Sequence, residues 1–266
     1  MIWHRSSDTK KVDLIIFMGQ SNMAGRGRAE EAPILPPGIA FEFKPISDPT
    51  RLYHLCEPFG VEENNFESGV SESNKTGSMV SSFALEYNKM TGQTIIGVSC
   101  SKGGTSIEQW QPEGSFLSDA ISRYRTTEHW LLDNGYTIMN TFMVWCQGET
   151  DGDQGMTRLE YTLKLTTMID AMIGAGIDRC YIVTIGNHRD HAERYQEIRA
   201  AQLDVCRQHN YAVLVSTEFE HMAASGLMTD EFHYSQQGYN MTGTDAGLHT
   251  AIDILARKKL NPDKAN

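Results

Sequence analysis

Apolar residues follow two patterns that alternate along the chain. Short apolar runs rich in β-branched residues are separated by longer segments in which apolar residues return every three to four positions. The first pattern is typical of strands buried on both faces, and the second is typical of helices with one buried face. Their alternation predicts an α/β fold in which helices flank a parallel sheet.

The patterns predict five strands and five helices. Strands are expected at 12–18, 94–100, 139–146, 180–185 and 212–216. Helices are expected at 79–90, 116–133, 158–173, 193–208 and 239–259, and Gly92 is expected to end the first of them. We interpret residues 1–266 as one domain of three α/β/α layers around a five-stranded parallel sheet.

Residues 25–78 interrupt the alternation. The segment holds most of the prolines and many glycines, so regular helix is not expected there. Residues 39–45 and 50–56 are compatible with a hairpin across Ser47-Asp48-Pro49. An irregular segment of this length is usually functional or disordered, and we expect it to form the rim of a substrate site.

Polar clusters follow the first three predicted strands. They read Gln20-Ser21-Asn22, Lys102-Gly103-Gly104 and Gln147-Gly148-Glu149. Ligands of open α/β sheets bind beyond the carboxyl ends of the strands, so these clusters predict a functional site at that edge.

Ser21 and His233 are the candidate nucleophile and base. A serine hydroxyl is a weak nucleophile until a neighbouring base accepts its proton. Asp230 precedes His233 by three residues, a spacing that lets its carboxylate bind one imidazole nitrogen while the other faces the serine. The backbone N–H groups of Ser21 and of the glycine turn at Gly103 and Gly104 are candidates for an oxyanion hole, with the amide of Gln147 as a third donor.

Other polar and aromatic residues near these clusters have more than one interpretation. Gln20 and Asn22 are expected to support the nucleophile or touch the substrate. For Glu149 we favour a hydrogen bond near the nucleophile over the alternative of a partner for His233. Trp110 either stacks on a sugar ring or closes the core, and Asp151 is interpreted as a turn or helix-cap residue.

No metal or cofactor is expected. His188 and His191 have no third ligand nearby, so we interpret them as part of a surface segment. Arg26 and Arg28 are interpreted as solvated loop residues. The five cysteines are odd in number and widely spread without a CxxC motif, which favours unpaired thiols.

Four segments, taken in order, resemble the conserved blocks of a known enzyme superfamily. They read GQSNMAGRG (19–27), KGGTSIEQW (102–110), WCQGETD (145–151) and DEFHYSQQGY (230–239). They are similar to the blocks of the SGNH hydrolase superfamily and, within it, to the sialate O-acetylesterase-like group with carbohydrate esterase family six and its acetylxylan esterases. The third block departs from the superfamily, which commonly has Asn where Gln147 stands and often His where Cys146 stands.

The resemblance implies a flavodoxin-like fold and removal of O-acetyl groups from sugars without metal or cofactor. It also implies Ser21 as nucleophile, His233 as base and Asp230 as its orienting acid. Two alternatives remain: an esterase for other short-chain or aryl esters, and a catalytically idle sugar-binding module. The expected partner is a small-molecule or oligosaccharide substrate with O-acetyl groups, whereas the oligomeric state is left open.

Charge and composition limit the classes of partner and the cellular location that we expect. The net charge is −11, from 34 acidic and 23 basic side chains, which disfavours nucleic acid as a partner. No run approaches the roughly 20 apolar residues that span a membrane. The N-terminal residues MIWHRSSDTKKVD lack the apolar region of a signal peptide. Together with the unpaired thiols this predicts a cytoplasmic protein, unless a leader was trimmed.

Overall fold

The computed structural model describes residues 10–260, in which all named strands belong to one sheet. The strand order is β3-β2-β4-β1-β5-β6-β7, and all neighbouring strands are parallel except β2 and β3. The strands are β1 (Lys10–Gly19), β2 (Ala40–Lys44), β3 (Asp48–His54), β4 (Thr94–Ser101), β5 (Tyr136–Cys146), β6 (Arg179–Val183) and β7 (Ala212–Ser216).

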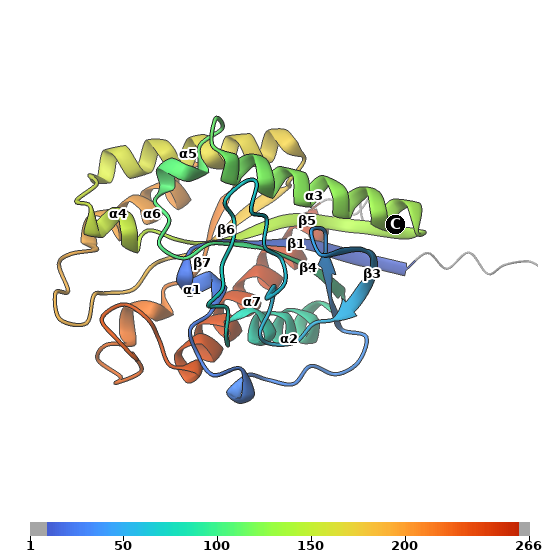
Figure 1. Ribbon diagram of the computed structural model, residues 1–266, viewed down its shortest axis with the longest axis horizontal. Helices are drawn as coiled ribbons and strands as arrows, with labels where there is room; N and C mark the ends of the chain where they lie inside the picture. The colour runs from blue at the N-terminus through green and yellow to red at the C-terminus, as the bar shows by residue number, and fades with distance from the viewer. Residues whose placement is uncertain (1–9, 261–266) are drawn as a thin grey trace, which may run out of the picture.

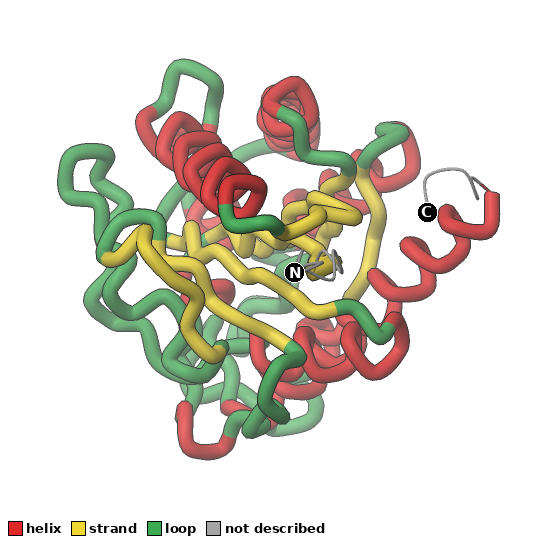
Figure 2. The backbone as a smooth tube through the Cα atoms, turned by 90° about the vertical axis from the view of Figure 1, so that its right-hand side faces the viewer, coloured by secondary structure: helices red, strands yellow, loops and turns green. Residues whose placement is uncertain are grey.

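Helices cover both faces of this sheet (Figure 1). One face packs against α3 (Ser115–Asp133), α5 (Arg158–Ala175) and α6 (Gln196–Gln208), and the other against α2 (Val80–Thr91) and α7 (Gln236–Leu260). Figure 2 shows the twisted sheet with helices on either side. The three-layer α/β/α architecture expected from the sequence is therefore present.

The sheet has seven strands, and the expected number of five is wrong. The additional strands β2 and β3 come from residues 25–78, where they form the hairpin that the sequence allowed. Strand β2 then pairs in parallel with β4 and so extends the sheet. A local pattern indicates a hairpin, but it does not reveal which sheet edge the hairpin joins.

Strand β1 shows why a central strand reads as a continuous apolar run. Leu14, Ile16 and Met18 pack on the side of α3 and α5, whereas Ile15 and Phe17 pack on the side of α2 and α7. All five are at most 1% exposed. Since successive side chains of a strand point to opposite faces, a strand covered on both faces carries apolar residues at consecutive positions.

The topology brings the polar strand ends together. In the sheet β1 lies between β4 and β5, so the chain leaves β1 toward one side and later crosses to the other, which makes the end of β1 a topological switch point. Gly19 lies opposite Ser101 of β4 and Cys146 of β5. The residues that follow these three positions therefore meet at one edge of the sheet.

Helix boundaries differ from the expected ones at a few ends. Helix α7 begins at Gln236, three residues before the expected Tyr239, and the hydroxyl of Ser235 accepts the backbone N–H of Gly238 at its start. Gly92 ends α2 in the left-handed conformation, as expected. Short helical turns that the sequence did not indicate include α1 (Ser21–Ala24), α4 (Glu149–Asp153), η1 (Ala29–Glu31), η2 (Ile107–Trp110) and η3 (Glu218–His221).

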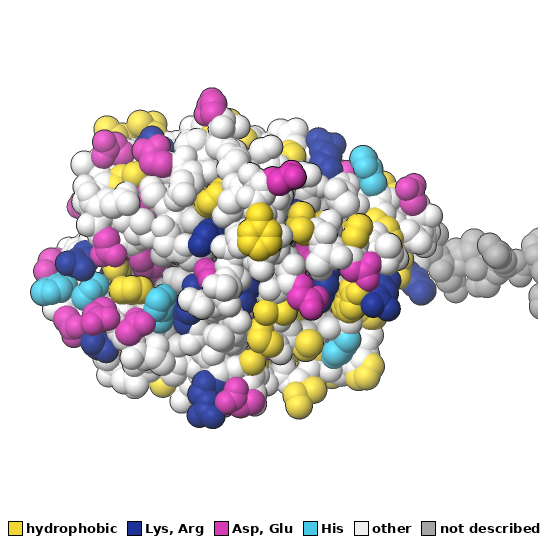
Figure 3. All heavy atoms as spheres, viewed as in Figure 1, with side chains coloured by type: hydrophobic (Ala, Val, Ile, Leu, Met, Phe, Trp, Pro, Cys, Tyr) yellow, Lys and Arg dark blue, Asp and Glu magenta, His cyan; other side chains and the backbone are white. Residues whose placement is uncertain are grey.

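Several further expectations concern the molecule as a whole. No helix within residues 10–260 has the length and apolarity needed to cross a bilayer. All five cysteines are unpaired, and Cys100, Cys146 and Cys180 are buried. On the face viewed in Figure 3, acidic and basic side chains are interspersed. Residues 1–9 and 261–266 lie outside the described part of the chain. Residues 1–9 include most of the N-terminal segment that was compared with signal peptides.

Candidate active site

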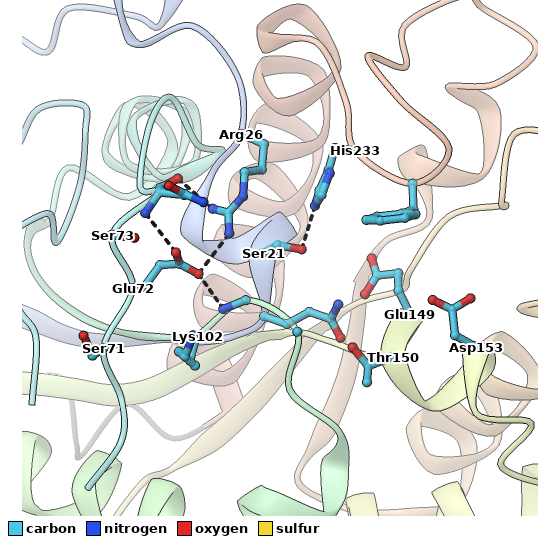
Figure 4. Close-up of a pocket in the computed structure, with 15 residues that line it drawn as sticks. Ser21, Arg26, Ser71, Glu72, Ser73, Lys102, Glu149, Thr150, Asp153 and His233 are labelled. Atoms are coloured by element: carbon cyan, nitrogen blue, oxygen red, sulfur yellow. Dashed lines mark hydrogen bonds and ion pairs between the residues drawn. The ribbon is translucent and has the colours of Figure 1, made fainter. Parts of the chain in front are cut away.

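Ser21, His233 and Asp230 form one hydrogen-bonded series. Ser21 Oγ lies 2.9 Å from His233 Nε2, and His233 Nδ1 lies 2.7 Å from Asp230 Oδ2. Figure 4 shows the side chains of Ser21 and His233 pointing toward one another. In the tautomer that carries its proton on Nδ1, the imidazole donates to Asp230 and accepts from the serine hydroxyl. This arrangement can activate a serine for attack on a carbonyl carbon.

Backbone geometry fixes the position of Ser21 just beyond the carboxyl end of β1. Ser21 is the first residue of α1 and follows β1 after Gly19 and Gln20. Gly19 has φ of 142°, and a Cβ atom there would lie 2.0 Å from the carbonyl oxygen of Cys146. Only glycine allows this close approach, so the turn into the nucleophile requires it.

The spacing between Asp230 and His233 forms a closed turn. Asp230 Oδ1 accepts the backbone N–H groups of Phe232 and His233 at 2.9 and 2.7 Å, which leaves Oδ2 for the imidazole. Burial acts to raise the pKa of Asp230, but these hydrogen bonds outweigh it and the pKa is lowered. Asp230 is therefore ionised at neutral pH beside the histidine.

A pocket of about 640 Å³ opens at Ser21 and His233. It is lined by residues from the ends of β1, β4 and β5, from the segment 25–78 and from the loop before α7 (Figure 4). These residues are Gln20, Ser21, Arg26, Ser71, Glu72, Ser73, Asn74, Lys102, Gly103, Gly104, Glu149, Thr150, Asp153, Phe232 and His233. The long irregular segment therefore does supply part of the rim, as expected.

The expected oxyanion-hole donors differ in their availability. Within residues 10–260, the backbone N–H groups of Ser21 and Gly104 have no hydrogen-bond acceptor. By contrast, the N–H of Gly103 donates to the carboxylate of Glu72 at 2.7 Å. The backbone donors of Ser21 and Gly104 are thus free, and that of Gly103 is engaged by a residue that the sequence did not single out.

Gln147 does not reach the pocket, which corrects its expected place in the oxyanion hole. Its side-chain amide donates to the carbonyl of Thr105 at 2.7 Å and to Asp151, and its side-chain oxygen accepts from Tyr161. The residue is fully buried. Both N–H groups of the Gln147 side chain are hydrogen-bonded within the protein, so neither is free to bind a substrate.

Asn22 and Glu149 form a buried support next to the nucleophile. Asn22 Nδ2 donates to Glu149 Oε1 at 2.6 Å and to the carbonyl of Phe232 at 3.0 Å, and its Oδ1 accepts from Tyr239. Burial raises the pKa of Glu149 to about 7. Glu149 therefore contacts the neighbour of Ser21 rather than His233, which agrees with the interpretation favoured from the sequence.

Gln20 and Asp151 also have support roles. Gln20 Oε1 accepts the backbone N–H of Gly148 at 3.1 Å and so joins the ends of β1 and β5. Asp151 accepts from the hydroxyl of Ser106 at 2.6 Å and from the N–H of Ile107, the first residue of η2. Asp151 itself lies within α4, so its interpretation as a turn residue is wrong, and its carboxylate instead accepts the first backbone N–H of η2 from across the fold.

Trp110 closes the core and does not line the pocket. Its indole N–H donates to Thr105 Oγ1 at 3.1 Å, and its ring packs edge-on against Phe116 and Trp145. The side chain is fully buried, so the alternative of stacking on a sugar is wrong.

The two arginines after the nucleophile differ. Arg28 is 69% exposed and pairs with Glu30, as expected for a solvated loop residue. Arg26 is only 17% exposed and pairs with Glu72 at 2.9 Å in the pocket wall. Its interpretation as a solvated residue is therefore wrong, because the segment that holds Glu72 folds over it.

Sequence reasoning missed Phe232 and Glu72. Phe232 is half-buried, lines the pocket, and its ring lies 4.5 Å from that of His233. Its position inside the block DEFHYSQQGY was the available signal. For Glu72, which lies in the irregular segment, no local pattern indicated its contacts.

No group of three His, Cys, Asp or Glu side chains within the described residues is arranged to hold a metal ion. His188 is only 5% exposed, and its ring packs near those of His191 and Tyr195. The expectation of a surface position is thus correct for His191, which is exposed, and wrong for His188.

Comparison with known proteins identifies the family. A family model described as carbohydrate esterase, sialic acid-specific acetylesterase, matches residues 11–248. The chain belongs to this family of esterases, which agrees with the resemblance of its four blocks. No curated protein sequence matches the chain.

Solved structures share the fold at low sequence identity. A protein from Arabidopsis thaliana is 19% identical with a TM-score of 0.69, and the match covers 92% of this chain and 98% of that one. NanS is 11% identical with a TM-score of 0.63, covering 94% and 99%. A carbohydrate acetylesterase from Xanthomonas citri is 17% identical with a TM-score of 0.54, covering 90% and 55%.

Proposed function

From this family membership, we propose that the protein is a serine esterase that removes O-acetyl groups from carbohydrates through an acetyl-serine intermediate. The observation that carries the proposal is the series Ser21, His233 and Asp230, with distances of 2.9 and 2.7 Å, at the bottom of an open pocket. The family alone indicates a carbohydrate esterase, and the series supplies a nucleophile with its base.

In the first step, Ser21 Oγ attacks the acetyl carbonyl carbon while His233 Nε2 takes its proton. The negative charge that develops on the carbonyl oxygen is stabilised by the free N–H groups of Ser21 and Gly104. The C–O bond to the sugar then breaks, and the sugar oxygen leaves with the proton from His233. Asp230 stabilises the imidazolium that exists between these two proton transfers.

In the second step, water hydrolyses the acetyl-serine. His233 takes a proton from the water as its oxygen attacks the acetyl carbon, and the bond to Ser21 Oγ then breaks. The proton passes from His233 to Ser21, which restores the hydroxyl. The balance is one ester and one water converted into one sugar alcohol and one acetic acid.

The rest of the pocket suits a sugar. Ser71, Ser73, Asn74 and Thr150 offer hydrogen-bonding groups, and Phe232 offers an aromatic face near His233. Carbohydrate sites combine such polar groups with an aromatic surface that covers the apolar face of the ring. This lining favours a sugar ester over a long-chain acyl ester.

The test compares the wild-type protein with Ser21→Ala on 4-nitrophenyl acetate, acetylated xylo-oligosaccharides and O-acetylated sialic acids. We expect acetate release from the aryl ester and from at least one of the two sugar classes, and its loss in Ser21→Ala. If butyrate and longer esters are cleaved faster than any acetylated sugar, the protein is an esterase of other specificity. Sugar binding without turnover would instead identify an idle binding module.

A further inference from the structure

Glu72 connects three walls of the pocket through one carboxylate (Figure 4). Its Oε2 accepts the backbone N–H of Gly103 at 2.7 Å and Arg26 Nη2 at 2.9 Å, and its Oε1 accepts the N–H of Asn74 at 2.9 Å. The side chain is 6% exposed. The segment 71–74, the turn after β4 and the chain that follows the nucleophile are thus joined at a single point.

This carboxylate is ionised at neutral pH. Burial acts to raise the pKa of Glu72, but the N–H of Asn74, the charge of Arg26 and the N–H of Gly103 outweigh it, so that the pKa is lowered. A charged acceptor makes a stronger hydrogen bond to a backbone N–H than a neutral one does. The hydrogen bond from Gly103 to Glu72 therefore holds the peptide group between Lys102 and Gly103 in a fixed orientation.

The anchored peptide adjoins a free donor of the oxyanion hole. A Cβ atom on Gly103 would lie 3.5 Å from Ser21 Cβ, so the turn passes directly beside the nucleophile. The next N–H along the chain, that of Gly104, is free of acceptors within the described residues. Because Glu72 fixes the peptide N–H of Gly103, it also restricts the orientation of the following peptide, which carries the N–H of Gly104.

A carboxylate in this place has a cost that Arg26 offsets. A bare negative charge near Ser21 would oppose the negative charge that develops on the substrate oxygen. The guanidinium of Arg26 pairs with Glu72 and is itself held by the carbonyls of Gly25 and Asn74, at 2.8 Å each. The pair presents no net charge to the reacting atoms.

We propose that Glu72 is a positioning residue for the oxyanion-hole turn and that Arg26 is its counter-charge, acting through Glu72 rather than by binding substrate. The proposal rests on the esterase function proposed above. It explains why an acidic and a basic side chain from distant parts of the chain line the pocket as a closed pair.

A double-mutant cycle tests the proposal. Glu72→Gln, Arg26→Gln and the double variant are compared by kcat and KM on 4-nitrophenyl acetate. Glu72→Gln keeps a neutral acceptor for Gly103, and we expect kcat to fall about 10-fold. Arg26→Gln leaves an unpaired carboxylate beside the oxyanion, and we expect kcat to fall about 100-fold. In the double variant the unpaired carboxylate is gone, so kcat recovers from the level of Arg26→Gln toward that of Glu72→Gln, while KM changes little in all three.

The exposed pair Arg28 and Glu30 provides the matched control. It has the same chemistry at 2.8 Å but lies outside the pocket, and the corresponding three variants are expected to keep kcat within about twofold. Arg26→Lys, which preserves the charge, is expected to stay within about fivefold of wild type. Cooperative thermal unfolding shows that each compared variant is folded.

Three results would overturn the proposal. The first is a double variant whose kcat is as low as that of Arg26→Gln. The second is a large rise of KM in both Arg26→Gln and Arg26→Lys. Either of these two results would mean that Arg26 binds the substrate directly. The third is a Glu72→Gln variant with the kcat of wild type.

A second measurement compares the same variants without an acetyl ester. It follows the rate at which a fluorophosphonate labels Ser21, detected by mass spectrometry. If the labelling rates follow the expected order although no acetyl ester is cleaved, only the proposed function fails; if wild type is not labelled either, both fail.

Discussion

Asn22 and Glu149 are hydrogen-bonded at 2.6 Å although 127 residues separate them in the chain. The same amide group of Asn22 reaches the carbonyl of Phe232, next to His233. One buried side chain thus joins the helix of the nucleophile, the end of β5 and the loop of the base. Glu149 is linked in this way to the segments that hold Ser21 and His233, and its second carboxylate oxygen has no partner within the described residues.

Glu149→Gln should make the stability of the protein less dependent on pH. Burial raises the pKa of Glu149 from 4.5 to about 7, so the folded state holds this proton more tightly than the unfolded state does. The free energy of unfolding therefore falls as pH rises from about 4.5 to above 7. The variant lacks this loss, and its stability relative to wild type should rise by about 3 kcal/mol over that range. Urea unfolding at several pH values measures the difference.

Glu42 provides an internal control for that measurement. Burial raises the pKa of Glu42 to about 7 as well, and it remains in both proteins, so its contribution cancels in the comparison. Parallel stability curves for wild type and Glu149→Gln would contradict the assignment of a protonated buried carboxyl to Glu149.

Asp230→Asn should cost far more activity than Glu149→Gln. Asp230 Oδ2 lies 2.7 Å from His233 Nδ1, and an amide in its place would favour the wrong imidazole tautomer. We expect kcat on 4-nitrophenyl acetate to fall about 10,000-fold in Asp230→Asn. In Glu149→Gln the side-chain oxygen still accepts from Asn22, and the decrease should stay below about 10-fold. The reverse order would make Glu149 the partner of His233.

Phe232→Ala should weaken sugar binding without harming the reacting groups. The ring lines the pocket beside His233, and an aromatic contact of this kind contributes about 1 kcal/mol. We expect KM for an acetylated sugar to rise about fivefold, with Phe232→Tyr near wild type. The kcat/KM for ethyl acetate, which has no ring to stack, should not change. Phe66, 81% exposed and outside the pocket, serves as the aromatic control in Phe66→Ala.

Gln147→Ala should reduce stability more than catalysis. The substitution removes the donor to the Thr105 carbonyl and to Asp151 and leaves a cavity in a fully buried position. We expect a loss of about 3 kcal/mol in the free energy of unfolding, with kcat changed less than about 10-fold in the folded protein. A 100-fold lower kcat at unchanged stability would instead place Gln147 in the oxyanion hole.

The sequence by itself determined the order of elements and the position of the chemistry along the chain. Five of the seven strands and the five long helices were predicted because burial on one face leaves a periodic apolar pattern and burial on both faces leaves a continuous apolar run. The blocks after β1, β4 and β5 were assigned to one edge because strands that run in parallel end on the same side. For Asp230 and His233 the contact is between near neighbours in sequence, so the spacing alone was informative.

Tertiary structure decided which residues from distant segments meet. Residues 40–54 extend the sheet, Trp110 faces the core, Gln147 supports Asp151, and Glu72 engages Gly103. Each of these contacts depends on how helices and loops pack across the sheet, and a hydrogen-bonding group binds the partner that packing brings within about 3 Å. Periodicity records which face of an element is buried, but it carries no information on that partner.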